Sequence, residues 1–192
     1  MGRGIRFALI ERILKKKYRG GSVLEIAAGG CLYRDLFEDY VSTDLPASSY
    51  YDSGDICVFC DGQVLPFKEN SFDFVFMIAA LYQIKTPELL IKEVSRVLKP
   101  RGQFIVFDYN KPRLIRVKNV EHGVVNHIWH PWELETLLKK YPFRTTFLLL
   151  EDYSFTYLGK VLSIIYKIPG AYCISNIFFE GWSIVHAEKR IR

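Results

Sequence analysis

The segment Val23-Leu24-Glu25-Ile26-Ala27-Ala28-Gly29-Gly30 decides the fold class of this chain. Its first half is apolar apart from Glu25, and this pattern predicts a short buried strand. The strand runs directly into a turn of small residues, where a backbone can approach a bound molecule closely. A strand of this kind, with an acid near its end, predicts a binding site for a charged and polyhydroxylated ligand.

Two further acidic turns repeat this arrangement. Asp44 closes the strand-like residues 41–43, and Asp61 begins the segment DGQVLPF at residues 61–67. That segment leads into the apolar run 72–78, a third predicted strand of the same type. Alternating strands and helices predict a parallel sheet whose ligands bind beyond the carboxyl ends of the strands. The acids at these strand ends are therefore expected to share one site.

The remaining elements complete an α/β pattern. Helical periodicity and a proline in the favoured first turn predict helices at residues 32–39, 87–98 and 131–140. Strand-like runs occupy residues 56–59, 103–108, 144–150 and 181–188. Only eleven residues separate Asp44 from Ile56, so the helix between these strands is expected to be short or missing.

Taken in order, these motifs resemble the class I S-adenosylmethionine-dependent methyltransferases, with a domain similar to methyltransferase type 11. The resemblance extends over residues 23–188 and includes the segments DGQVLPFKENSFDFVFM and IKEVSRVLKPRGQFIVFD. It implies a Rossmann-like, doubly wound sheet of seven strands, mostly parallel with an antiparallel last strand and helices on both faces. It also implies methyl transfer with S-adenosylmethionine as cofactor. A nicotinamide cofactor is disfavoured because the motif G-x-G-x-x-G is absent.

The resemblance implies a set of cofactor-binding residues at the strand ends: Glu25, Ala27, Gly29, Asp44, Asp61, Gly62, Gln63 and Ile78. In this set, Asp44 would accept hydrogen bonds from both ribose hydroxyls, and Asp61 would accept one from the adenine amino group. Glu25 would hold the loop or the cofactor amine through charge-assisted hydrogen bonds.

The loop after the first strand departs from the family pattern acid-x-Gly-x-Gly-x-Gly. Ala27 stands at the first glycine position and Cys31 at the third, so that only Gly29 is retained. An alanine can replace glycine where φ is negative, and with such a backbone the loop would keep its fit. The alternative is a degenerate cofactor loop in a non-catalytic scaffold.

The methyl acceptor is expected beyond the end of the strand at 72–78. Tyr82 and Gln83 follow that strand and are the first candidates for contact with the substrate, and His127 is a third candidate. Neither an Asn/Asp-Pro-Pro-aromatic motif nor a Pro-Cys motif follows the strand, which argues against methylation of amino groups or cytosine C5 in DNA. Because a sulfonium is a good leaving group, positioning and desolvation would carry most of the catalysis.

Histidine and cysteine spacing does not predict a metal site. His122, His127 and His130 form no helical His-x-x-x-His pair, and no carboxylate is obviously paired with them. The four cysteines include a single C-x-x-C spacing, at residues 57–60, and reduced thiols in the cytoplasm are expected.

Composition and charge suggest how the chain is organised and what it contacts. A chain of 192 residues with 49% hydrophobic residues is expected to form one domain, with no membrane-spanning run and no secretory signal. Its parts are a basic helix at 1–21, a cofactor half at 22–109 and a substrate half at 110–192, with an apolar insertion at 155–179.

The basic helix and the insertion each have more than one interpretation. The helix would contact an anionic surface weakly, would dock RNA or another polyanion, or would simply present a solvated face while covering the ligand cleft. The insertion would line an apolar acceptor pocket, form a homodimer face or pack on the outer sheet. We therefore expect a small-molecule or lipid-like acceptor, with an RNA or other polyanion as the alternative substrate.

Overall fold

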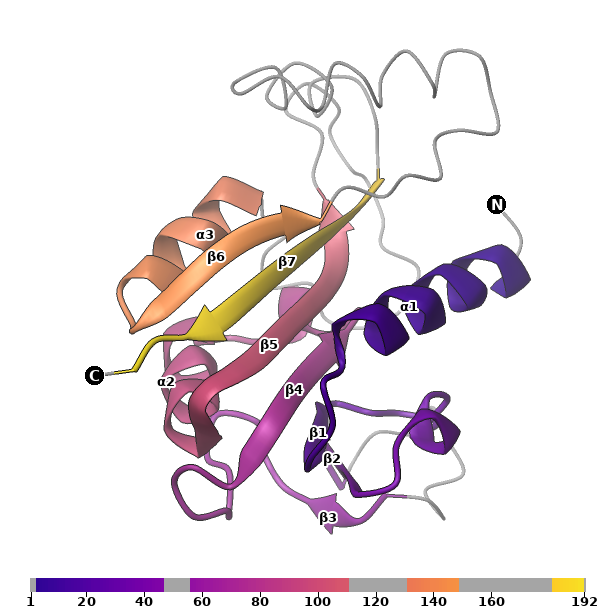
Figure 1. Ribbon diagram of the computed structural model, residues 1–192, viewed down its shortest axis with the longest axis horizontal. Coiled ribbons are helices and arrows are strands. Elements are labelled where there is room, and N and C mark those ends of the chain that lie inside the picture. The colour runs from indigo at the N-terminus through magenta and orange to yellow at the C-terminus, as the bar shows by residue number, and fades with distance from the viewer. Residues whose placement is uncertain (1–2, 47–55, 111–130, 149–180, 192) are drawn as a thin grey trace.

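The described part of the chain contains one seven-stranded sheet (Figure 1). The structure is a computed structural model, and it describes residues 3–46, 56–110, 131–148 and 181–191. The strands are β1 (Val23–Ile26), β2 (Tyr40–Asp44), β3 (Val58–Phe59), β4 (Phe72–Ile78), β5 (Leu98–Asn110), β6 (Phe143–Leu148) and β7 (Gly181–Lys189). The helices are α1 (Arg3–Lys17), α2 (Pro87–Val97) and α3 (Pro131–Lys139), with short 3-10 helices η1 (Arg34–Leu36) and η3 (Leu81–Gln83).

The strand order confirms the predicted fold class. The order is β3-β2-β1-β4-β5-β7-β6, with β1 lying between β2 and β4 and parallel to both. Strand β4 pairs in parallel with β5, whereas β7 runs antiparallel to its two neighbours, β5 and β6. Strands β1, β2, β3, β4 and β5 therefore all bring their carboxyl ends to one edge of the sheet, which we call the carboxyl edge; the opposite one is the amino edge.

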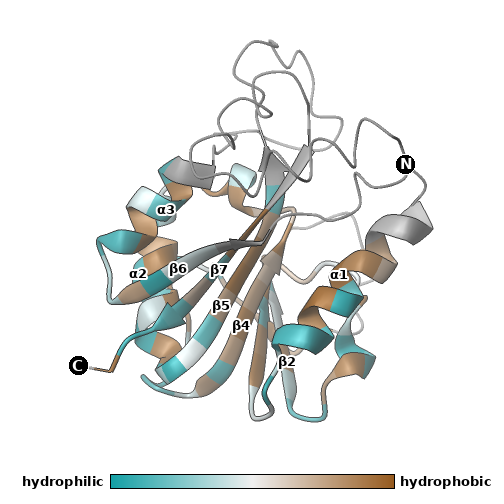
Figure 2. Cartoon of the chain, turned by 45° about the horizontal axis from the view of Figure 1, so that its top comes forward, coloured by the Kyte–Doolittle hydropathy of each residue, from teal (hydrophilic) through white to brown (hydrophobic). Residues whose placement is uncertain are grey.

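Alternation along the strands builds two cores. On β1, Leu24 and Ile26 face the core that contains α2 and α3, whereas Val23 faces the core that contains α1. Strand β4 alternates in the same way, with Val75 on one side and Phe74 on the other. Figure 2 shows hydrophobic residues concentrated along the central strands β4 and β5, with helices on both sides of them.

Helix α2 follows directly from its sequence. Pro87 lies in the first turn, where its missing N–H costs nothing. Apolar residues then recur with helical spacing, and each of them is fully buried against the sheet: Leu90, Ile91, Val94 and Val97.

Helix α1 occupies most of the basic segment predicted as a helix at residues 1–21. Ile10 and Leu14 are buried against the sheet, whereas Arg12 and Lys16 are exposed. Two glycines with positive φ, Gly20 and Gly21, separate the helix from β1. Among the described residues, no helix combines the length and the apolarity needed to cross a bilayer.

One local prediction was wrong, and one predicted strand is longer than expected. The helix expected at residues 32–39 is a series of turns that contains only the three-residue η1. The physical reason is that Cys31 has a φ of +50°, and that Tyr33 and Phe37 bury their rings on the α1 side while Leu32 stays 63% exposed. The strand expected at 103–108 begins earlier, because residues from Leu98 onward already pair with the start of β4.

Other boundaries lie close to the predictions. Strand β3 keeps only Val58 and Phe59 of the run predicted at 56–59. The link between β2 and β3, for which a short or missing helix was expected, lies largely in residues 47–55, outside the described residues.

Candidate functional site

The loop after β1 has an unusual backbone. Ala27, Gly29 and Cys31 have φ values of +55°, +53° and +50°, so every second residue is left-handed. The negative φ expected at Ala27 is therefore wrong. These three residues occupy the three glycine positions of the family pattern, so the loop keeps a glycine-type backbone although two of its residues have side chains. A left-handed non-glycine residue costs roughly 1 to 2 kcal/mol, which the surrounding contacts must offset.

Hydrogen bonds from β2 hold this loop in place. The Ala28 N–H donates to the Thr43 carbonyl oxygen over 3.0 Å, and the Gly29 N–H donates to Asp44 Oδ2 over 2.8 Å. The other carboxylate oxygen of Asp44 accepts from the Leu45 N–H over 2.7 Å. Asp44 thus lies at the carboxyl edge in direct contact with the loop, and its side chain is only partly buried.

Glu25 lies beneath the loop in a low-polarity environment. It is 3% exposed, and the Tyr40 hydroxyl donates a hydrogen bond to Glu25 Oε2. Burial raises the pKa of Glu25 to about 8, the bond from Tyr40 opposes this shift, and the negative charge of Asp44 adds to it. Glu25 is therefore largely protonated at neutral pH. The charge-assisted hydrogen bonds predicted for Glu25 would require its ionised form.

Two tyrosines surround this carboxyl group. The Tyr33 side chain is 5% exposed, and among the described residues its hydroxyl has no hydrogen-bond partner. Burial raises the pKa of Tyr33, and the charge of Glu25 adds to the shift. The Tyr33 ring packs edge-on against Phe76, which lies opposite Glu25 on β4. Sequence reasoning missed both tyrosines; the contact of Tyr40 with Glu25 depends on the pairing of β2 with β1.

Asp61 and Gln63 form a small network after β3. Asp61 Oδ1 accepts from the Gln63 N–H over 2.8 Å, and the Gln63 side-chain amide donates to both carboxylate oxygens. Gln63 Oε1 in turn accepts from the Thr86 N–H over 3.2 Å. The Cys60 N–H donates to the Asp44 carbonyl oxygen over 2.9 Å. The residue before Asp61 is therefore bonded directly to the end of β2.

Gly62 brings the network close to the sheet. A Cβ atom at Gly62 would lie 2.8 Å from Ile26 Cγ2 and 3.2 Å from Leu90 Cδ1. The absence of a side chain therefore lets residues 61–63 pack onto the end of β1.

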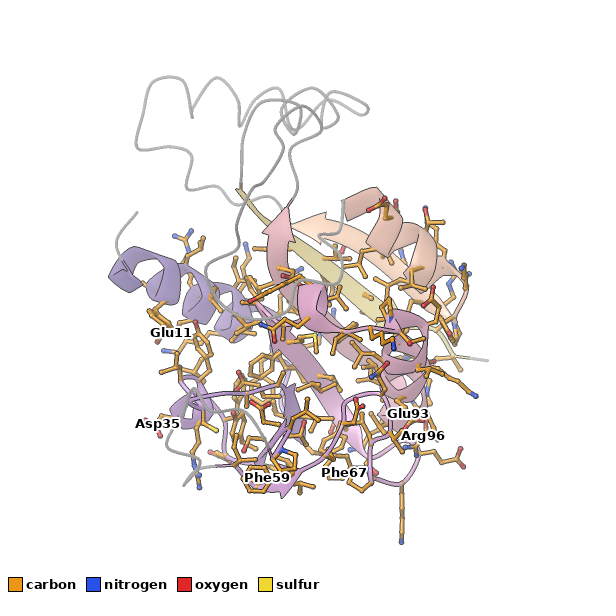
Figure 3. All side chains as sticks on the ribbon, turned by 180° about the vertical axis from the view of Figure 1, so that it is seen from behind. Glu11, Asp35, Phe59, Phe67, Glu93 and Arg96 are labelled. Atoms are coloured by element: carbon orange, nitrogen blue, oxygen red, sulfur yellow. The ribbon has the colours of Figure 1, made fainter. Side chains whose placement is uncertain are left out.

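Helix α2 fixes the rest of this segment. Glu93 and Arg96 form an ion pair of 2.7 Å on the helix (Figure 3). Glu93 Oε2 accepts from the Leu65 N–H over 2.9 Å, and Arg96 donates to the carbonyl oxygens of Leu65 and Phe67. Val64, which lies between Asp61 and these anchored residues, is 71% exposed. Leu45, which follows β2, is about half exposed.

The acceptor-side candidates lie on η3, next to the ends of β4 and β5. Ile78 is the partly buried last residue of β4, and Ala79 after it has a φ of +54°. Tyr82 is 4% exposed, Gln83 is exposed, and the Gln83 side-chain amide donates to the Tyr82 hydroxyl over 2.8 Å.

Asp108 is a further acid of this edge that sequence reasoning missed. It is 1% exposed near the end of β5, and its Oδ2 accepts from the Tyr82 N–H over 3.0 Å. The rule that selected Asp44, an acid at the carboxyl end of a predicted strand, could also have selected Asp108.

Several predicted features lie outside the described residues. These are His127 with its neighbours His122 and His130, and the apolar insertion at 155–179. Within the described ranges, no group of three His, Cys, Asp or Glu side chains is placed to hold a metal ion. A small polar hollow lined by Arg19, Asp73 and Arg101 lies at the amino edge, away from the residues described above.

Known proteins with similar sequences are named as methyltransferases, and the matches cover only part of each protein. Residues 24–106 match the family model described as "Methyltransferase domain". A sterol 4-C-methyltransferase from Caenorhabditis elegans is 33% identical over 112 residues, which cover 56% of this chain and 34% of that protein. A ubiquinone/menaquinone biosynthesis C-methyltransferase from Cellvibrio japonicus is 38% identical over 53 residues, 28% of this chain and 21% of that protein. The chain therefore matches about a third or less of the length of these relatives.

Solved structures share the fold over nearly the whole chain. The crystal structure of the YcgJ protein from Bacillus subtilis has a TM-score of 0.67 at 16% identity, covering 99% of this chain and 100% of that one. The strand order and the matched family model agree: residues 24–106 match the methyltransferase domain family, and the sheet has the fold of the class I S-adenosylmethionine-dependent methyltransferases.

Proposed function

We propose that this protein is a methyltransferase that uses S-adenosylmethionine to methylate a small-molecule or lipid-like acceptor. One observation carries the proposal: the left-handed backbone at Ala27, Gly29 and Cys31, with the Gly29 amide bonded to Asp44. Two side-chain residues keep a costly conformation at a strand end where ligands bind in parallel sheets. Strain of this kind persists where the surrounding structure maintains it, and a ligand site accounts for it.

The described residues fit the parts of this cofactor. The amino-acid part would lie against the loop at 27–31, with Glu25 beneath it. Asp44 would receive the ribose hydroxyls and Asp61 the adenine amino group, because both carboxylates are at least partly exposed at the edge. Leu45 and Val64 would cover the faces of the adenine ring, which accounts for two large apolar side chains left exposed after β2 and β3. When bound, the cofactor supplies an electrophilic methyl group on a positively charged sulfur.

The chain itself would orient the reactants and exclude water. The turn at 79–83 begins at the end of β4, and Asp108 holds it through the Tyr82 amide. A bond between the side chains of Gln83 and Tyr82 orders the exposed amide next to the predicted methyl position. Such positioning suffices for an in-line displacement whose leaving group needs no protonation.

The named relatives support the acceptor class. The two relatives described above are named as enzymes that methylate a sterol and act in quinone biosynthesis. Sterols and quinones are largely apolar, so these names support a lipid-like acceptor.

A labelled-methyl assay tests the proposal. The protein would be incubated with S-adenosylmethionine labelled on the methyl group and with sterols, quinone precursors or transfer RNA. The proposal predicts a labelled, organic-soluble product that is lost in an Asp44→Ala variant. Label in the RNA fraction alone would favour the polyanion alternative.

The RNA alternative depends on α1. Arg12 and Lys16 are exposed on this helix, whereas Lys15 pairs with Glu11 and Arg19 pairs with Glu188. Because intramolecular pairs already occupy part of the positive charge, we favour the small-molecule acceptor over a polyanion.

The scaffold alternative depends on the loop. Ala27 and Cys31 are strained where glycine would not be, and a protein that no longer binds the cofactor would accumulate such changes. The scaffold alternative predicts that S-adenosylhomocysteine does not bind to the wild-type protein.

A further inference from the structure

We propose that Glu25, Tyr33 and Tyr40 form a proton-coupled site for a cationic ligand, in which binding of the positive charge expels a proton from Glu25 to solvent. This inference rests on the proposed function, because S-adenosylmethionine carries a sulfonium and an ammonium group. It goes further by assigning roles to two tyrosines and by predicting how affinity depends on pH.

The first step of the argument is the burial of Glu25. The side chain lies on β1 beneath the loop at 27–31, is 3% exposed and has a hydrogen bond from the Tyr40 hydroxyl. An ionised carboxylate in such a place needs either a cation or several donors. None of the described groups that shift the pKa of Glu25 is a cation.

The second step is the unused donor. The Tyr33 hydroxyl is buried without a hydrogen-bond partner among the described residues, which is rare in native proteins and calls for an explanation. The Tyr33 ring packs edge-on against Phe76, which lies opposite Glu25 on β4, with ring centroids 6.2 to 6.4 Å from its aromatic neighbours, and the charge of Glu25 acts on the Tyr33 hydroxyl. A neutral carboxyl group is satisfied by fewer donors than a carboxylate, so the Tyr33 hydroxyl becomes useful once Glu25 ionises. Tyr33 and Tyr40 are thus positioning residues that would hold the anion.

The third step concerns the surrounding charges. Tyr40 and Asp44 approach Glu25 from β2, Phe76 lies opposite it on β4, and Cys31 acts on Tyr40. Glu11 on α1 acts on Tyr33 and adds further negative character. The described groups that act on Glu25 and Tyr33 are therefore acidic or neutral, so an arriving cation is the component that would make the ionised form of Glu25 favourable.

The fourth step gives the direction. The pKa of Glu25 is about 8 in the ligand-free protein, and a bound cation lowers it. Below this pH, ionisation must accompany binding, so affinity for the cation is expected to fall by up to about tenfold for each unit by which the pH drops.

Calorimetric titration with S-adenosylmethionine tests this inference. At pH 6.5, titrations in phosphate and in imidazole, which both buffer at this pH but differ in ionisation enthalpy, give the number of protons released. Wild-type protein should release close to one proton more per bound ligand than Glu25→Gln, whose affinity should vary less with pH. Equal proton numbers in both proteins would overturn the inference while leaving cofactor binding intact. No binding by the wild type would contradict the proposed function as well.

A phenylalanine variant tests the role of Tyr33. Tyr33→Phe should weaken S-adenosylmethionine binding several-fold without lowering the melting temperature, because the lost hydroxyl has no partner in the described structure. Tyr18→Phe is the matched control: Tyr18 packs in the same core, but its hydroxyl donates to the Gly21 carbonyl oxygen at the amino edge. Unchanged binding in Tyr33→Phe would show that this hydroxyl has no part in the site.

Discussion

Both ends of strand β1 have residues with positive φ, but the residue types that adopt this conformation differ between the two ends. Before the strand, the residues with positive φ are Gly20 and Gly21, which bear no steric cost. After it, positive φ falls on Ala27 and Cys31 as well as on Gly29. The end that enters the sheet uses residues suited to its geometry, whereas the end at the proposed cofactor site keeps strained ones.

The acids at the two edges also differ in how well hydrogen-bond donors stabilise their ionised forms. Asp73, at the amino edge, accepts bonds from the Ser22 N–H, the Ser22 hydroxyl and Lys99 Nζ. Burial opposes ionisation of Asp73, but these donors outweigh it and lower its pKa. Glu25 has a raised pKa and lies near an unused donor. Around β1, strain and an unmet polar group therefore lie at the carboxyl end, as expected where a ligand completes the structure. Elsewhere at the amino edge, Asn70 and Arg101 also have positive φ.

The largest effect is expected from Gly21→Ala at the amino edge. Its φ is +91°, and a Cβ atom would lie 2.2 Å from Asp73 Oδ2, so the satisfied network must move. We expect the free energy of unfolding to fall by roughly 3 kcal/mol or more in chemical denaturation. Gly20→Ala is the matched control: its φ is +94° but nothing lies within 4 Å of the added atom, so about 1 kcal/mol should be lost. Equal losses would show that Asp73 does not hold this end of β1.

Glu25→Gln should change how stability depends on pH. The folded pKa of about 8 lies above the ordinary value of 4.5 for a glutamic acid, so the native state holds the proton more tightly than the unfolded chain. Stability from this group is complete below about pH 4.5 and is lost as pH rises towards 8. Without ligand, wild type should lose stability over this range relative to Glu25→Gln, as measured by urea unfolding. Parallel curves for the two proteins would mean that Glu25 is ionised in the native state.

His186 should show the opposite pH dependence. It is 7% exposed, its Nδ1 lies 3.0 Å from Thr146 Oγ1, and its Nε2 lies 3.3 Å from the Gln103 side-chain amide. Burial lowers its pKa from 6.5 to about 4, and the positive charge of Lys17 adds to this. Its contribution is therefore present above pH 6.5 and is lost as pH falls towards 4. The melting temperature should drop by several degrees between these values, and less in His186→Gln. A drop of the same size in His186→Gln would assign it to other groups.

The smallest effect is expected from Ala27→Gly. Glycine relieves the left-handed strain but adds freedom to the unfolded chain, so the two terms nearly cancel and stability should change by less than about 1 kcal/mol. Binding of S-adenosylhomocysteine should be retained or improved, as measured by calorimetry. Ala28→Gly, at a buried neighbour without positive φ, should be clearly destabilising, by about 1 kcal/mol. Weaker binding in Ala27→Gly would mean that the alanine side chain itself contributes to the site.

Features that depend on neighbouring residues in the sequence were predictable, whereas features that depend on contacts between different strands were not. The strand at Phe72–Ile78 was predicted with its observed bounds, because an unbroken apolar run is a local signal. The α2 start at Pro87 was predicted for the same reason. The left-handed φ at Ala27 was not predicted, because the loop is held by hydrogen bonds that it donates to Thr43 and Asp44 on another strand.

The positions of the candidate site residues were predictable where they depended on strand ends. Asp44 and Asp61 do lie at the carboxyl edge, near one another along the ends of β2 and β3. The surroundings of Glu25 were not predictable, because Tyr40 reaches it only through the register that pairs Val23 with Tyr40. Asp108 was missed although its position at a strand end gave the same signal as Asp44.

The central claim is that the carboxyl edge, and not the amino edge, binds the cofactor. Calorimetric titration with S-adenosylhomocysteine of wild type, Asp44→Ala and Asp73→Asn tests this most directly, since the two variants alter one acid at each edge of the sheet. The account predicts micromolar binding by wild type, loss of at least about tenfold in affinity in Asp44→Ala, where hydrogen bonds to a charged group are removed, and unchanged affinity in Asp73→Asn. Undiminished binding by Asp44→Ala, or no binding by the wild type, would contradict it.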